Sequence, residues 1–451
     1  MRKKLDMLNG PLVPTLSRMT SSNLLAVISL LAFQLTDAFF ISRLGSDALA
    51  AFGLTLAPTL MTISIALGLG SGVSVNLARL LGQNKQQEAK QFVSHALLLT
   101  LLISVSIALL GIATIKPLFA LLGADASLLP LFHDYMFTWY AGITLLILQI
   151  QANQALRASG YTLAPALVTI LIAVTNGILD PLLIFGIGPF PELGFHGAAV
   201  ATFMAWVVSF SAAAYLLLIK HKLPSKPQFT RLRQHWRELL HIARPCTLSN
   251  LLNPAAGAVL IALMARIDTH AVAALGVGMR IEGVMLIAVT ALSGTLTPFL
   301  AQNIGAGQMK RAFHALFSCL QLLLLWQMAL YLLVWLCSSQ IAALFAVEAE
   351  TGQVLSQYLL WLPASYGLLA VVILYSVLLN AQHLPLKALS LNIIRLGTLL
   401  PAAFVGQYVA GAQGVFIAMT AANCFAGLVC WQLAKRRAAP WAGADAASIG
   451  L

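Results

Sequence analysis

Charged residues are scarce in this sequence. They make up 9% of its 451 residues, whereas 60% are hydrophobic. In a soluble domain about a quarter of the residues are charged. This composition therefore excludes a soluble protein and indicates an integral membrane protein. At about 20 residues per membrane-spanning helix, the length allows about a dozen spans and no separate soluble domain.

Other absences exclude several classes of function. The five cysteines lie in apolar runs without a CxxC pair, and the nine histidines show no metal-ligand spacing, which argues against disulfide and metal sites. The chain has neither a GxxxxGK[ST] phosphate loop nor a TVGYG-type filter. We therefore expect no enzyme, no metal cofactor and no potassium-type channel. No A-x-A cleavage site precedes the first apolar run, so we expect the first helix to stay attached.

The apolar runs predict an all-α membrane protein of twelve transmembrane helices. The predicted spans lie near residues 14–41, 49–76, 93–115, 131–156, 162–187, 196–219, 243–265, 271–300, 313–336, 354–380, 386–409 and 412–434.

The net charge of +12 is explained by membrane topology. If the N-terminus is cytoplasmic, the predicted spans place only three of the 26 Lys and Arg residues outside (Arg43, Lys116 and Arg266), and two lie within spans (Arg280 and Arg395). The remaining 21 lie inside, as the positive-inside rule requires. We expect both termini in the cytoplasm and no nucleic-acid partner.

The chain contains an internal repeat. At a constant offset of 223 residues, Arg43 matches Arg266, and Gly82 matches Gly305. Each half contains six spans, which predicts two six-helix bundles related by a pseudo-twofold along the membrane normal, enclosing a central cleft suited to alternating access. The predicted domains are an N-terminal lobe (1–219), a cytoplasmic linker with a short surface helix (220–242), a C-terminal lobe (243–437) and a disordered tail (438–451).

Asp37 is a carboxylate inside the first span. An acid at this depth is costly, about 2.5–3.5 kcal/mol at a helix centre, so it usually faces a polar interior and marks an ion or substrate path. Gln34 lies one turn earlier and would share that face. The alternative is that Asp37 lies in the outer interface, near the end of its helix.

The fifth span carries a second polar group. Asn176 and Asp180 are four residues apart and share a helix face, and Thr169 extends the polar stripe. Asp180 and Asp37 both fall in the outer halves of their spans, so they could share one cavity, although Asp180 could instead be interfacial. Two buried carboxylates cannot both ionise cheaply, which suits such a pair to exchanging a proton for a cation.

Other polar residues in the spans are weaker candidates. Tyr140 could reach the same cavity or belong to an aromatic belt, and Asn153 could line the cavity or hydrogen-bond between helices. Arg395, alone at mid-depth in the eleventh span, is a candidate in the C-terminal bundle. Arg280 and Glu282 are expected to form a local charge pair at the outer end of the eighth span.

Two inner-loop sequences resemble a known family. LARLLGQNKQQEAK follows the second span, and LAQNIGAGQMKRA, with Gln302 and Asn303, follows the eighth span after GMRIEG at 278–283. They resemble the paired signatures of the multidrug and toxic compound extrusion (MATE) transporters over about residues 10–437. The resemblance implies a cation-coupled drug exporter of the bacterial inner membrane.

The DinF-like branch of that family uses an acid in span one and an Asn-x-x-x-Asp pair in span five for proton coupling, and Asp37, Asn176 and Asp180 match them. The branch's cavity tyrosine would be Tyr140. Sodium-coupled relatives carry acids in spans seven and ten, which here contain none. The resemblance therefore favours protons as the coupling ion, with sodium left open.

We expect export of hydrophobic or cationic drugs and toxic compounds in exchange for protons, by a monomer embedded in membrane lipid. One alternative is a flippase for lipid-linked precursors, but such a cleft should carry several arginines, and only Arg280 and Arg395 lie in spans. A passive channel would show no dependence on the proton gradient.

Overall fold

The computed structural model describes residues 4–121, 129–226, 228–345 and 348–442, and these residues form helices and connecting loops without a strand. In the first half the α-helices are α1 (Leu12–Ser42), α2 (Ser46–Gly82), α3 (Gln86–Leu121), α4 (Leu129–Ala158), α5 (Leu163–Ile184) and α6 (Gly194–Ala214). A π-helical turn (Tyr215–Lys220) continues α6, and a 3-10 turn (Phe229–Arg231) precedes α7 (Leu232–Met264). In the second half they are α8 (Thr269–Met285), α9 (Ile287–Gly305), α10 (Met309–Leu336), α11 (Ser338–Phe345), α12 (Ala349–Trp361), α13 (Tyr366–Ala381) and α14 (Pro385–Ala442).

Among these described residues, nine helices are long and apolar enough to cross a membrane, and the bent pair α8–α9 adds a tenth. α14 supplies two spans, because the backbone leaves the helical region at Ala410 and Gly411. α4 packs against α2, α3 and α6 and completes the first set of six. The predicted all-α membrane fold with two six-helix bundles is confirmed.

The helix boundaries repeat between the halves. α2 runs from Ser46 to Gly82, and the pair α8–α9 runs from Thr269 to Gly305, so both ends keep the offset of 223. The break in α14 has the same origin as the start of α6: Gly194 and Gly411 both have a left-handed backbone, with φ of 55° and 56°. Only glycine adopts this conformation without strain, so the sequence fixes both breaks.

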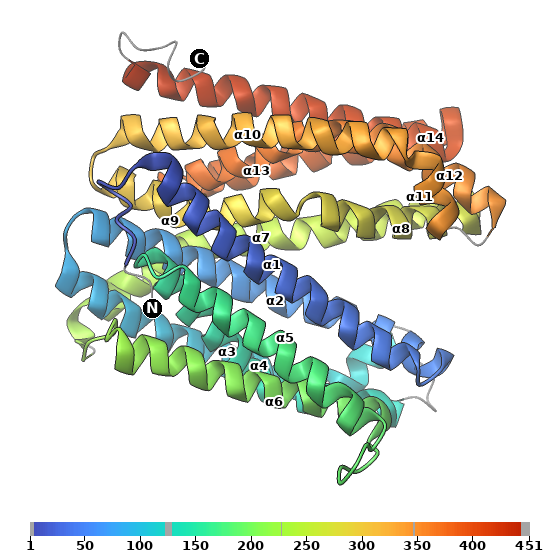
Figure 1. The fold of residues 1–451 in the computed structure, drawn as a ribbon, viewed down its shortest axis with the longest axis horizontal. Coiled ribbons are helices and arrows are strands. Elements are labelled where there is room, and N and C mark those ends of the chain that lie inside the picture. The colour runs from blue at the N-terminus through green and yellow to red at the C-terminus, as the bar shows by residue number, and fades with distance from the viewer. Residues whose placement is uncertain (1–3, 122–128, 227, 346–347, 443–451) are drawn as a thin grey trace. The chain divides into compact units, whose positions relative to one another are not determined.

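The chain divides into two compact units, residues 1–247 and 248–451. In the first unit α1 lies beside α5, and α4 contacts both α3 and α6 (Figure 1). In the second unit α13 occupies the position equivalent to that of α4, against α9 and α10.

The predicted linker differs from the observed structure. Residues 232–242 are not a separate surface helix but the first turns of α7, which continues to Met264. These turns pack on α3, because Trp236 Nε1 donates to the carbonyl of His95 (2.9 Å) and the rings of His95 and His235 share a hydrogen bond (2.8 Å). The segment therefore belongs to the first unit.

Three further boundaries differ from prediction. The eighth predicted span is bent by 47° at Leu286, between α8 and α9. The tenth is interrupted by a 3-10 turn at Leu362–Ser365, where Pro363 removes a backbone donor. The tail predicted to be disordered is helical from Ala438 to Ala442, and Ala438 is buried; residues 443–451 lie outside the described part of the chain.

Candidate functional site

Asp37 lies on the buried face of α1. Its side chain is 6% exposed, in a helix whose other face carries exposed leucine and phenylalanine. Gln34, predicted to accompany it, is exposed instead, because residues three apart differ by about 60° around the helix. The structure therefore buries the acid without its predicted neighbour.

Asn176 and Asp180 form the second part of the site on α5, and neither side chain is exposed. Asn176 Nδ2 donates to Asp180 Oδ1 (3.0 Å) and lies 3.4 Å from Thr202 Oγ1 of α6. Pro181 has no N–H, so the carbonyl of Gly177 loses its helical donor and faces the same turn as an additional acceptor.

The packing of α1 on α5 brings these two groups together. Gly177 of α5 faces Thr36 of α1, since a Cβ at this position would lie at an ordinary packing distance from the methyl of Thr36 (3.6 Å). Thr36 precedes Asp37 and Gly177 follows Asn176, so the polar turns of the two helices meet. Asp37 and Asp180 are close enough that their charges interact with each other.

Three acceptor oxygens of this site have no hydrogen-bond donor among the described residues: Asp37 Oδ1, Asn176 Oδ1 and Asp180 Oδ2. A buried acceptor without a donor is destabilising by about 1–3 kcal/mol. A proton on either carboxyl would convert one acceptor into a donor.

Tyr135 of α4, and not Tyr140, is the tyrosine beside the acids. The phenol of Tyr135 interacts electrostatically with both Asp37 and Asp180, and its ring stacks on Phe195 (4.5 Å). Tyr140 packs against Gly111 of α3 and Trp139, within the apolar core of the unit. The family resemblance suggested Tyr140, which lies five residues further along α4 and therefore on a different side of the helix.

The structure does not bring Thr169 and Asn153 to the acids by any contact among the described residues. Thr169 Oγ1 donates to the carbonyl of Pro165, one turn earlier in α5 (3.0 Å). Asn153 is buried towards the other end of α4, and its Oδ1 has no donor.

Arg395 belongs to a separate buried network in the second unit. Its guanidinium donates to Asn253 Oδ1 (2.8 Å) and Asn423 Oδ1 (3.1 Å), and Asn423 Nδ2 donates to Ser365 Oγ (3.1 Å). These contacts link α7, the 3-10 turn and both segments of α14. Arg395 therefore belongs to the second unit, as predicted from its span, and none of its hydrogen-bond partners is a residue of the Asp37 site.

Glu282 lies in a hydrogen-bond network that the sequence did not predict. Tyr358 donates to Glu282 Oε2 (3.1 Å) and shares a hydrogen bond with Tyr366 (3.1 Å). The predicted pairing with Arg280 is wrong: Arg280 is exposed, and the described residues show no ion pair between the two. Residues two apart on a helix point in different directions, which was the available signal. The carboxyl of Glu282 also interacts electrostatically with the guanidinium of Arg395.

The comparisons with known proteins agree on one family. The sequence profile of the MatE family matches residues 24–182 and 245–405. A protein of Shewanella oneidensis named FAD transporter is 46% identical over 98% of both chains, and the probable multidrug resistance protein YoeA of Bacillus subtilis is 26% identical over 82% of both. A mutant of the Vibrio cholerae MATE transporter VcmN has a similar structure, with a TM-score of 0.91, 30% identity, and coverage of 95% of this chain and 97% of that one.

The family profile, the whole-length relative and the apolar helices are consistent with one another. Members of this family are multi-pass membrane transporters of small molecules, and the predicted family is confirmed. The chain belongs to the MatE family of transporters.

Proposed function

We propose that this transporter exports its substrate in exchange for protons, and that Asp37 and Asp180 bind the proton, with Asn176 completing the coupling site through its hydrogen bond to Asp180. The observation that carries the proposal is the set of three buried acceptor oxygens without donors on two facing helices. An amide and two carboxyls supply fewer donors than acceptors, and a proton corrects that imbalance.

Protonation would also change the charge of the site. The ionised pair is negatively charged and the protonated pair is not, so proton uptake from the outside would rearrange the hydrogen bonds of the site and favour release of substrate outward. The driving force is sufficient, since one charge moving through 100 mV is worth about 2.3 kcal/mol. The proposal takes the transporter as a monomer in the bacterial inner membrane, surrounded by lipid, with both termini in the cytoplasm.

Flavin adenine dinucleotide is our first candidate substrate. The support is the relative of that name, whose 46% identity extends over 98% of both chains. Hydrophobic or cationic drugs are the second candidate, supported by relatives named for multidrug resistance at 23–26% identity.

Proton movement in reconstituted vesicles tests the mechanism. Substrate added to one side of purified protein in liposomes should release protons on that side, with sodium absent. Asp37→Asn and Asp180→Asn should each abolish this signal. The matched control is Asp134→Asn on α4, whose carboxylate is 66% exposed and should be dispensable. Full proton movement in either site variant, or a signal that requires sodium, contradicts the proposal.

The substrate is tested in the same vesicles. Flavin adenine dinucleotide and ethidium, a cationic aromatic compound, are each added at the same concentration with an imposed pH gradient. Transport of the dinucleotide alone supports the first candidate, and transport of ethidium alone supports the second. Failure of both rejects both substrate assignments without affecting the family.

A further inference from the structure

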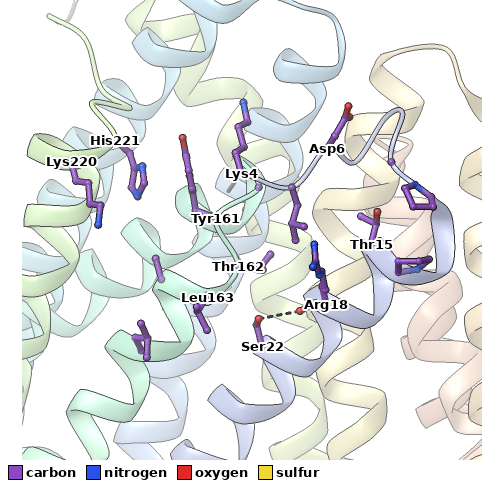
Figure 2. A pocket seen from close by; sticks show the side chains of 17 residues that line it. Lys4, Asp6, Thr15, Arg18, Ser22, Tyr161, Thr162, Leu163, Lys220 and His221 are labelled. Carbon is purple, nitrogen blue, oxygen red and sulfur yellow. Dashed lines mark hydrogen bonds between the residues drawn. The ribbon is translucent and has the colours of Figure 1, made fainter. Parts of the chain in front are cut away.

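A cavity of about 450 Å³ lies at the end of the first unit that carries its basic loops. Its walls come from the segment before α1, the first turns of α1 and α5, the loop between α4 and α5, and the end of the π-helical turn after α6. Figure 2 shows Lys4, Arg18 and Lys220 arranged around it. Neither Asp37 nor Asp180 lines it, so it is distinct from the acid site.

The cavity is positively charged. Three cationic side chains line it (Lys4, Arg18 and Lys220), against one acid, Asp6. The carboxylate of Asp6 is already engaged, because Oδ1 accepts from the backbone N–H groups of Leu8 and Asn9, both at 3.0 Å. Among the described residues neither Lys4 nor Arg18 forms an ion pair.

An aromatic stack forms one side of this cavity. The rings of Tyr161 and His221 are stacked with centroids 3.7 Å apart. Burial and the adjacent charge of Lys220 lower the pKa of His221, so the ring is neutral at neutral pH. The excess positive charge therefore comes from the three permanent cations.

The cavity is built by a fixed backbone contact. The N–H of Leu5 donates to the carbonyl of Gly160 (3.1 Å), which holds the segment carrying Lys4 against the loop between α4 and α5. Gly160 has a left-handed backbone (φ of 90°), and a Cβ there would lie 2.8 Å from the carbonyl oxygen of Leu5. Glycine at position 160 therefore allows the N-terminal segment to pack closely against this loop.

We propose that this cavity binds a phosphate-bearing anion. Cations from three separate segments converge on one concave site, and Arg and Lys form their strongest hydrogen bonds with phosphate and carboxylate oxygens. Two sources present this group at a membrane surface: a soluble nucleotide or pyrophosphate, and the headgroup of an anionic phospholipid, which basic pockets between membrane helices also bind. The inference does not depend on the substrate assigned above.

Direct binding tests the soluble source. Purified full-length protein in neutral detergent is titrated calorimetrically with inorganic pyrophosphate and, separately, with flavin adenine dinucleotide. Arg18→Gln and Lys4→Gln should each weaken binding about tenfold, the loss of one charge-assisted contact. Lys90→Gln is the matched control, because Lys90 is an exposed cation on α3 that does not line the cavity. Added salt should weaken binding further.

Native mass spectrometry tests the lipid source. The same four proteins are released from nanodiscs containing equal amounts of phosphatidylglycerol and phosphatidylcholine. Retention of phosphatidylglycerol by the parent and the Lys90→Gln control, with loss in the Arg18→Gln variant, identifies a headgroup site. Saturable binding in either experiment that depends on Arg18 and Lys4 supports the proposal. It is overturned if neither probe binds saturably, or if Lys90→Gln weakens binding as much as the cavity variants do.

Discussion

At the residue scale, the two units differ in how many hydrogen-bond donors surround their buried carboxyl groups. Among the described residues Asp180 has one side-chain donor, Asn176, whose amide also donates to Thr202 Oγ1. Glu282 in the second unit instead receives a hydrogen bond from Tyr358, which itself is paired with Tyr366. Glu282 is therefore held in a satisfied network, whereas the Asp37–Asp180 pair keeps unsatisfied oxygens, which is why we propose the pair as the proton site.

Tyr135 should matter for transport, and Tyr140 should not. The Tyr135→Phe change removes the phenol that interacts with both acids but keeps the ring stacked on Phe195. An electrostatic interaction of about 1 kcal/mol between the phenol and the carboxyls corresponds to about a fivefold change in rate, so we expect transport to slow about fivefold. Tyr140→Phe is the control. Transport rates in vesicles, normalised to the amount of folded protein, decide the result, and equal rates for both variants would refute this role.

The sequence predicted the acids more reliably than their surroundings, for a physical reason. Asp37 and Asp180 stand out because an ionisable group within an apolar span is rare without a function. The choice between Tyr135 and Tyr140 depends on the rotation of α4 about its axis, which apolar residues on all sides do not specify. Gln34 was misplaced for the same reason, since α1 is exposed over much of its surface.

At the element scale, the two halves use the same glycine contact to join their last two spans. A Cβ at Gly197 would overlap the carbonyl oxygen of Leu183, and a Cβ at Gly414 would overlap that of Gly406. Leu183 and Gly406 are themselves related by the offset of 223 residues. The close packing of α5 on α6 and of the two segments of α14 therefore has one origin.

Gly197→Ala and Gly414→Ala should each destabilise their unit. The added methyl meets backbone, which cannot move aside as a side chain can, and overpacking of this kind costs about 1–3 kcal/mol. Gly276→Ala is the control, because its Cβ would meet nothing within 4 Å and alanine stabilises a helix by about 0.5–1 kcal/mol relative to glycine. Thermal unfolding in detergent should show a lower Tm for the first two variants only. An unchanged Tm in these variants would show that the glycine contact does not stabilise the unit.

Continuity between elements was the hardest feature to predict. The predicted spans 386–409 and 412–434 anticipated the break in α14, but the predicted start of a span at residue 243 placed a boundary inside α7 that does not exist. The contacts of Trp236 and His235 with His95 of α3 keep the helix continuous into the first unit. Such tertiary contacts override local signals and are not visible in a single sequence.

At the scale of the whole molecule, the distribution of basic residues predicts the orientation of the chain in the membrane. The segment after α6 carries Lys220, Lys222 and Lys226. The loop after α5, at the opposite end of α6, carries no Lys or Arg. Moving positive charge outward is opposed by the membrane potential and by anionic lipid on the inner surface. This asymmetry is the basis for our proposal that the termini and the basic cavity face the cytoplasm.

Thiol labelling in intact cells tests that orientation. Ile187, in the loop between α5 and α6, is 51% exposed, and Lys226 is exposed in the loop before α7. In a background with Cys337→Ser and Cys424→Ser, which removes the two native cysteines that are not fully buried, Ile187→Cys should react with a membrane-impermeant maleimide in intact cells. Lys226→Cys should react only after permeabilisation, because the reagent cannot reach the cytoplasm. The reverse pattern would invert the topology, and with it the side from which protons reach Asp37 and Asp180.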